Sequence, residues 1–182
     1  NSWNTFGSNI SDELIRSTAR TMKEKGYLEA GYNYIVIDDC WSLKERDAQG
    51  RLVPDPEKFP HGMKDLADYV HSLGFKFGMY SCAGTHTCAG YPGSFEHEYE
   101  DAETFASWGV DYLKYDWNPN DHYYTTEMHE ALLAQERDIV YSLSNSAPYG
   151  DAPVWMQKAN CWRTTGDIRD NWNSIYKIGF QG

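Results

Sequence analysis

The sequence predicts an α/β fold in which parallel strands are connected by helices, and three observations support this prediction. Short apolar runs of strand length alternate along the chain with longer amphipathic segments, as in a parallel sheet with crossover helices. The 182 residues are 41% hydrophobic and 24% charged, which is typical of a globular domain with its own core. The sequence shows neither an internal repeat nor a linker, so we expect one domain over residues 1–182.

Each predicted strand is a short apolar or β-branched run that ends at polar residues. The run at 34–37 has no polar side chain except that of its first tyrosine, as in a strand buried on both faces. The other predicted strands lie at 75–80, 112–115, 139–143 and 161–164.

The predicted helices carry apolar residues at helical spacing amid charged ones. The first two end at Gly26 and Gly74, and glycine is the residue that most often follows a helix C-terminus. The expected helices span 11–25, 63–73, 99–108, 125–136 and 170–177.

Unusual polar residues stand at or just past the carboxyl ends of these strands. In a (β/α)8 TIM barrel the carboxyl ends of all the strands form the rim of the active site, whereas an open doubly wound sheet binds ligands only at its switch point. Polar groups after five successive strands therefore favour the barrel. We expect the chain to hold about the first six βα units, with the C-terminal part of the barrel, roughly two units, missing.

The charge of the chain excludes some classes of partner. Its formal net charge is −11 and its pI is about 4.9, which disfavours binding to nucleic acid or to an anionic membrane. The sequence contains no apolar run of the roughly 20 residues that cross a bilayer. Aromatic residues make up 15% of the chain, and they suit sugar stacking and a bulky core equally well.

Two carboxylates at strand ends suggest acid/base and nucleophilic chemistry. Asp116 follows Lys114 by two residues, so both side chains lie on one face of a strand, and the ammonium favours the ionised carboxylate. Asp167 stands four residues after Arg163. Glycoside hydrolysis with retention uses two such carboxyl groups. The alternatives are a structural Lys–Asp pair for Asp116 and a helix N-cap for Asp167, although Asp170 fits the cap equally well.

The adjacent acids Asp38 and Asp39 follow the first predicted strand. Neighbouring carboxylates can bind a metal, accept hydrogen bonds from sugar hydroxyls or transfer protons. A metal is the weaker option because no further acidic cluster is nearby in the sequence. The spacing of Cys82, His86 and Cys88 is likewise not one of the usual zinc-ligand spacings.

Five sequence blocks in the same order resemble glycoside hydrolase family 27, the family of α-galactosidases and α-N-acetylgalactosaminidases. The blocks are NSWNTFG (1–7), IVIDDCW (35–41), GMYS (78–81), YLKYD (112–116) and WRTTGD (162–167).

The resemblance implies a retaining hydrolase that needs neither a metal nor an organic cofactor and acts on α-galactoside oligosaccharides or glycoconjugates. It makes Asp116 the nucleophile and Asp167 the acid/base. It implies that Asp38 and Asp39 hold the 4- and 6-hydroxyls of galactose. Its remaining substrate-binding positions are Trp3, Tyr80, Lys114, Ser144, Ala147 and Arg163.

Two departures from the family pattern affect the interpretation. Secreted relatives form disulfides with cysteines at the positions of Ser8 and Asn118, so this chain lacks both partners, which favours a reducing, bacterial-type cytoplasm without excluding secretion. Ser144 and Ala147 match the small residues that make room for an acetamido group in animal α-N-acetylgalactosaminidases. The resemblance as a whole predicts an α-galactosidase, and Ser144 and Ala147 keep an α-N-acetylgalactosaminidase open as an alternative, beside an inactive sugar-binding relative.

Overall fold

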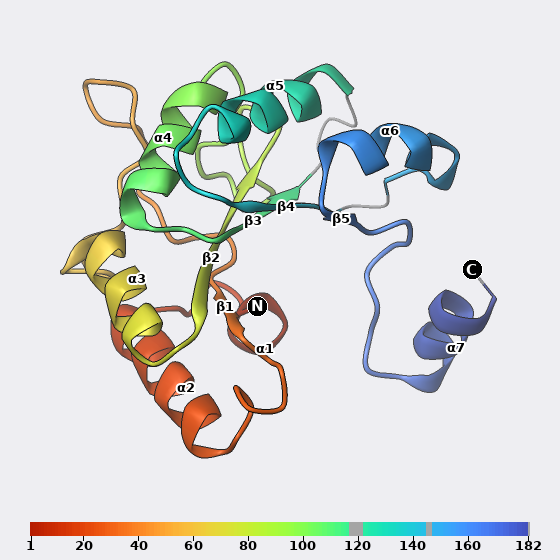
Figure 1. The fold of residues 1–182 in the computed structure, drawn as a ribbon, viewed down its shortest axis with the longest axis horizontal. Coiled ribbons are helices and arrows are strands. Elements are labelled where there is room, and N and C mark those ends of the chain that lie inside the picture. Colours follow the sequence, from red (N-terminus) through yellow and green to blue (C-terminus); the bar gives the residue numbers. More distant parts are fainter. Residues whose placement is uncertain (117–121, 145–146, 182) are drawn as a thin grey trace.

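The computed structural model describes residues 1–116, 122–144 and 147–181, and these residues form a parallel five-stranded sheet (Figure 1). The strands are adjacent in the order in which they occur in the chain, and each pair is parallel. This sequential order is the one expected for part of a (β/α)8 barrel. The strands are β1 (Tyr34–Val36), β2 (Lys76–Cys82), β3 (Tyr112–Asp116), β4 (Val140–Leu143) and β5 (Cys161–Trp162).

The crossover helices form a layer along one side of this sheet (Figure 1). Helix α2 packs on α3, α3 on α4, α4 on α5 and α5 on α6, so neighbouring helices follow the order of the strands. The helices are α1 (Trp3–Phe6), α2 (Asp12–Glu24), α3 (Gly62–Ser72), α4 (Glu98–Trp108), α5 (His122–Leu133), α6 (Ala152–Lys158) and α7 (Trp172–Phe180), with a 3-10 turn, η1, at Tyr149–Asp151.

The predicted alternation of strands and helices is confirmed, with three differences. The described residues contain five strands where about six βα units were expected. Helices α1 and α6 were not predicted because both are short and α6 buries only Trp155, so neither has a helical period to detect. The cap of α7 is Asn171, whose side chain accepts a hydrogen bond from the Ser174 amide, and neither Asp167 nor Asp170 fills that role.

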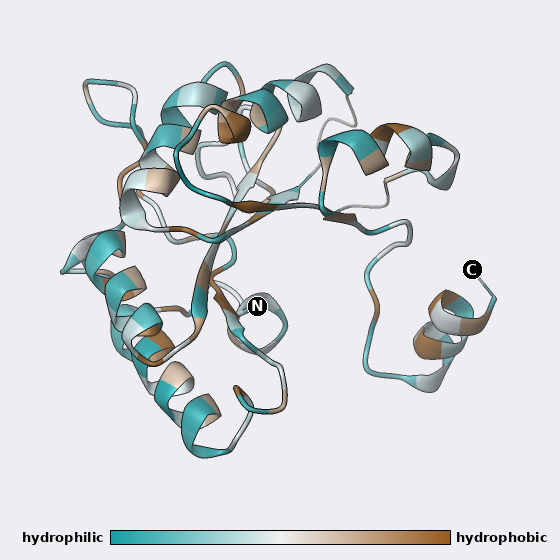
Figure 2. Ribbon diagram, in the orientation of Figure 1, coloured by the Kyte–Doolittle hydropathy of each residue, from teal (hydrophilic) through white to brown (hydrophobic). Residues whose placement is uncertain are grey.

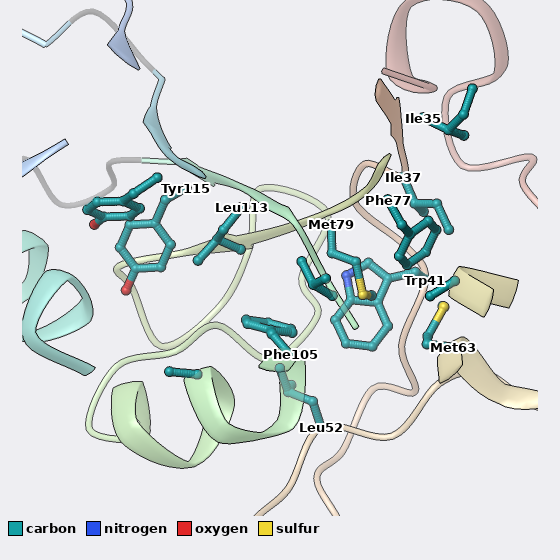
Figure 3. Close-up of a cluster of buried hydrophobic side chains, with 14 of the residues drawn as sticks. Ile35, Ile37, Trp41, Leu52, Met63, Phe77, Met79, Phe105, Leu113 and Tyr115 are labelled. Atoms are coloured by element: carbon teal, nitrogen blue, oxygen red, sulfur yellow. The ribbon is translucent and has the colours of Figure 1, made fainter. Parts of the chain in front are cut away.

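The two faces of the sheet have opposite chemistry because side chains alternate along each strand. The face toward the helices is hydrophobic, and Figure 3 shows its side chains gathered with those of the helices and loops. The other face carries the polar side chains, including Tyr80, Lys114, Asp116 and Ser142. The buried residues of the helix side include Ile35, Phe77, Met79, Leu113, Tyr115, Tyr141 and Leu143.

Aromatic packing fixes α4 against the segment that follows β1. The rings of Trp41 and Phe105 lie 6.4 Å apart, and Trp108 lies 5.8 Å from Trp41 in an edge-on arrangement. Edge-on pairs at this separation are the favoured geometry for aromatic rings. Trp41 therefore ties the end of β1 to the helix layer (Figure 3).

Helix α7 is separated from the sheet by an extended segment (Figure 1) and buries none of its side chains. Trp172, Tyr176 and Phe180 lie on one face of α7 with their rings in contact, and all three are exposed. Hydrophobic residues of α7 are visible in Figure 2. In the part of the chain that the structure describes, no helix is long and apolar enough to span a membrane.

Candidate active site

The carboxyl ends of the strands meet at a cavity of about 680 Å³ on the polar side of the sheet. The register places Tyr80 beside Lys114 and Lys114 beside Ser142, so these three side chains form one row. Nine of the ten predicted site residues line the cavity: Trp3, Asp38, Asp39, Tyr80, Lys114, Asp116, Ser144, Arg163 and Asp167.

Asp116 is the last residue of β3 and is buried. The Tyr80 hydroxyl donates a hydrogen bond of 2.9 Å to Oδ2 of Asp116, and the Ser144 hydroxyl donates to Oδ1. Both carboxylate oxygens therefore have a fixed partner, Tyr80 on β2 and Ser144 just after β4, which holds the carboxylate in one orientation.

Lys114 lies between two carboxylates of the cavity. Its Nζ is 2.8 Å from Oδ2 of Asp38 and 3.8 Å from Oδ1 of Asp116. Asp38 also accepts a 2.7 Å hydrogen bond from the Asn1 side chain. One ammonium therefore offsets part of the negative charge of two buried acids.

Tyr80 is buried, and its backbone carbonyl accepts a 3.0 Å hydrogen bond from the Trp41 indole. Burial, together with the carboxylates of Asp116 and Asp39, raises the pKa of Tyr80 far above its ordinary value. The phenol therefore stays protonated at any physiological pH and acts as a hydrogen-bond donor to Asp116.

Asp39 contacts the loop after β2. Its Oδ1 accepts hydrogen bonds from the Cys40 amide (2.7 Å) and the Thr87 hydroxyl (3.0 Å), and its Oδ2 accepts one from the Ala89 amide (3.2 Å). Asp39 is 3% exposed. These three hydrogen bonds offset the free-energy cost of burying the Asp39 carboxylate.

Asp167 differs from the other acids because it is exposed. It lies between β5 and α7, its side chain is 82% exposed, and Nη1 of Arg163 is 2.5 Å from its Oδ1. Asp167 lines the same cavity as Asp116, so the structure brings the two predicted catalytic carboxylates to one site.

Ala147 is the predicted site residue that does not line the cavity. It is fully buried, and its amide donates a 2.7 Å hydrogen bond to the Arg163 carbonyl. Ser144, the other small residue that the family resemblance placed at the site, lines the cavity and contacts Asp116.

Sequence reasoning missed Asn1, Thr87 and Cys88. Asn1 and Cys88 line the cavity, and Thr87 contacts Asp39. The signal available for Thr87 and Cys88 was the length of the loop after β2, since long loops in compact domains are usually functional.

The four cysteines are free thiols. Burial raises the pKa of Cys82 to about 12, and burial together with nearby carboxylates raises the pKa of Cys88. Asn118, where secreted relatives have a cysteine, lies outside the described residues. Among the described residues, no three Cys, His, Asp or Glu side chains form a group that could hold a metal ion.

Known proteins with a similar sequence or fold are named alpha-galactosidases. Residues 4–180 match the family model described as alpha galactosidase A. The chain is 51% identical over 180 residues to an alpha-galactosidase of Coffea arabica, covering 96% of this chain and 48% of that protein. The crystal structure of alpha-galactosidase I from Mortierella vinacea superposes with a TM-score of 0.91 at 41% identity, over 95% of this chain and 46% of the other.

A structure of alpha-galactosidase from Saccharomyces cerevisiae with raffinose gives a TM-score of 0.88 at 42% identity, over 93% of this chain and 39% of the other. The fold is that of part of a glycoside hydrolase barrel. The chain belongs to the α-galactosidase family, glycoside hydrolase family 27. It spans about half the length of the curated relatives it matches.

Proposed function

We propose that the protein carrying this chain hydrolyses terminal α-linked galactose with retention of configuration, and that residues 1–182 supply its catalytic carboxylates. The observation that supports this most is Asp116, a buried carboxylate held by hydroxyl donors on both oxygens beside the ammonium of Lys114. The Coffea arabica and Mortierella vinacea relatives are named α-galactosidases, and the Saccharomyces cerevisiae enzyme was crystallised with raffinose, a galactoside.

The proposed reaction has two steps. In the first, Asp116 attacks the anomeric carbon, the bond to the leaving oxygen breaks, and that oxygen takes a proton from Asp167. In the second, Asp167 takes a proton from water, the water oxygen attacks the anomeric carbon, and Asp116 is released as a carboxylate. Retaining hydrolysis needs the two carboxyl groups about 5–5.5 Å apart.

The ion pair between Arg163 and Asp167 bears on the first step. Nη1 of Arg163 lies 2.5 Å from Oδ1 of Asp167, the proposed general acid. Arg163 also lines the cavity. We propose that sugar hydroxyls engage Arg163 on binding and draw its guanidinium away from Asp167.

The placement of Ala147 favours galactose over N-acetylgalactosamine. An enlarged subsite for an acetamido group needs a small residue at the cavity surface, and Ala147 is buried away from the cavity. Ser144 is at the cavity, but its hydroxyl is bonded to Asp116. We therefore expect an aryl α-galactoside to be hydrolysed with the higher kcat/KM when both aryl glycosides are assayed side by side.

The test of the carboxylate roles uses three variants of the intact protein. Asp116→Asn should lower kcat/KM on an aryl α-galactoside by about 10⁴-fold or more, because the nucleophile is lost. Asp167→Ala should lose far more activity on an alkyl galactoside than on a dinitrophenyl galactoside, which leaves without a proton. Asp170→Asn is the matched control, since Asp170 is an exposed acid outside the cavity. Activity of Asp116→Asn equal to that of the control contradicts the proposal.

We also propose that this chain works in a reducing compartment, because its four thiols are unpaired and Ser8 and Asn118 replace the family's disulfide partners. Protein purified without reductant and denatured should bind a thiol reagent at all four of its cysteines. Fewer reactive thiols would show that a disulfide forms.

A further inference from the structure

The loop between β2 and α4 contains a tight turn that lies against Asp39. Within this turn the Thr87 amide donates to the Tyr91 carbonyl (2.8 Å), and the Gly90 amide donates to the Thr87 carbonyl (2.9 Å). The turn carries Cys88 to the cavity, where Cys88 and Asp39 both line the wall. The turn is therefore part of the cavity and not a remote surface loop.

The Thr87 hydroxyl joins Asp39 to this turn. It donates a 3.0 Å hydrogen bond to Oδ1 of Asp39 and accepts a 3.1 Å hydrogen bond from the Tyr91 amide. Thr87 is 8% exposed and does not itself line the cavity. One hydroxyl group thus fixes a cavity carboxylate against the loop without reaching the ligand space.

The rest of the loop is fastened independently of Thr87. Nζ of Lys44 donates to the Ala89 carbonyl (3.0 Å) and lies 3.7 Å from the centre of the Tyr91 ring. Arg46 donates a 2.6 Å hydrogen bond to the Gly93 carbonyl. Gly93 has no space for a side chain, since a Cβ there would lie 2.1 Å from the Gly84 carbonyl oxygen. We therefore expect these contacts to keep the loop in place when the Thr87 hydroxyl is removed, even though the Tyr91 amide then loses its side-chain acceptor.

The hydrogen bonds of Asp39 leave one oxygen only partly occupied. Oδ1 accepts two hydrogen bonds, from Cys40 and Thr87, whereas the described contacts give Oδ2 one, from the Ala89 amide. A carboxylate oxygen can accept two hydrogen bonds. Because Asp39 lines the cavity, Oδ2 is the oxygen that can accept one from a ligand hydroxyl.

We propose that Thr87 is a positioning residue for substrate selectivity: by holding Oδ1 of Asp39, it aims Oδ2 at the 6-hydroxyl of the bound galactoside. The proposal rests on the proposed function, and it assigns a role to Thr87 that acts only through Asp39. Thr87 should therefore matter for a substrate with a 6-hydroxyl and be nearly neutral for one without it.

The experiment compares an aryl α-galactoside with the matching aryl 6-deoxy-α-galactoside on the intact protein. Thr87→Val, which keeps the shape and removes the hydroxyl, should lower kcat/KM on the galactoside about tenfold and change it less than twofold on the 6-deoxy substrate. Thr87→Ser, which keeps the hydroxyl, should retain the selectivity of the unchanged protein. Thr85→Val is the matched control, because Thr85 is an exposed threonine of the same loop whose hydroxyl contacts only the His86 ring among the described bonds.

The outcomes distinguish a failure of the role proposed for Thr87 from a failure of the proposed hydrolase function. An equal fall on both substrates, or a fall that Thr87→Ser shares, would mean that Thr87 has only a structural role and overturns the inference. Unchanged activity of Thr87→Val on both substrates also overturns it. If the unchanged protein hydrolyses neither substrate, the proposed function fails, independently of Thr87.

Discussion

At the scale of single residues, the environment of Asp116 depends on contacts between strands. Tyr80 on β2 and Ser144 just after β4 reach it from opposite sides. The type and strand-end position of Asp116 were visible in the sequence, but the two hydroxyl donors were not, since their partners are 36 and 28 residues away along the chain. Sequence spacing predicts neighbours within a strand and says nothing about register between strands.

Removing the Tyr80 hydroxyl should therefore impair the proposed chemistry. A hydrogen bond to a charged group contributes about 1.5–3 kcal/mol, so Tyr80→Phe should lower kcat by about 10- to 100-fold, with a smaller effect on KM. Steady-state kinetics on an aryl α-galactoside measure this. Tyr141→Phe is the control, because Tyr141 is also buried but donates to the Thr125 carbonyl on the helix side. Equal losses in kcat for the two variants would contradict the role given to Tyr80.

At the scale of elements, Arg46 connects the loop after β1 with two parts of the chain that follow β2, the loop around Gly93 and helix α4. Its guanidinium forms two hydrogen bonds with Asp101 of α4, at 2.7 and 2.8 Å, and also bonds the carbonyls of Gly50 and Gly93. Asp101 is fully buried. Burial raises the pKa of Asp101, and the Arg46 guanidinium opposes that rise. The long loops after β1 and β2 are thus fixed to the helix layer by one side chain.

Breaking this pair should be costly because it leaves a buried carboxylate without its cation. Arg46→Met should lower the free energy of unfolding by about 3–5 kcal/mol, measured by urea denaturation. Replacing both partners, with Arg46→Met and Asp101→Leu, should recover a large part of the loss. Arg20→Met removes an exposed ion pair with Glu13 and should cost less than about 1 kcal/mol. Similar costs for Arg46→Met and Arg20→Met would show that the buried pair is not a structural link.

The elements themselves were largely predictable, and the exceptions have physical causes. Helix α2 was predicted at 11–25 and spans Asp12–Glu24, with Ser11 capping it by accepting a hydrogen bond from the Leu14 amide. Helix α6 was missed because its seven residues bury one side chain, so tertiary packing decides its conformation. Ala147 was predicted at the site, but its side chain is fully buried in the hydrophobic core and its amide bonds to the Arg163 carbonyl.

At the scale of the whole molecule, Asp111, the residue before β3, links strand β2, helix α3 and the segment between α5 and β4. Its Oδ2 accepts a 2.8 Å hydrogen bond from the Phe77 amide and lies 2.7 Å from Nε2 of His71. Its Oδ1 lies 2.6 Å from Nη2 of Arg137. Burial alone would raise the pKa of Asp111, but these partners outweigh it and hold the pKa below its ordinary value. The stabilisation is therefore present above the unfolded-state pKa of about 3.9 and is lost as pH falls through the lower folded-state pKa.

Asp111→Asn should consequently lower stability most at neutral pH. We expect the free energy of unfolding to fall by about 1–3 kcal/mol at pH 7, with the difference shrinking below about pH 4, as measured by denaturation at several pH values. Asp68→Asn, which removes an exposed pair with Lys64, should change little at either pH. A difference that is independent of pH would show that the charge of Asp111 does not contribute.

Because hydrophobic and polar side chains alternate along the strands, substitutions in the sheet have two separate kinds of effect. Substitutions of the strand residues that face the helices, such as Met79, Leu113 or Tyr115, alter packing against the helices and so affect folding. Substitutions of the alternate residues, which face the cavity, such as Tyr80, Lys114 or Ser142, alter the cavity surface. The surface of the cavity can therefore change during evolution at every second residue of the strands while the hydrophobic face stays constant.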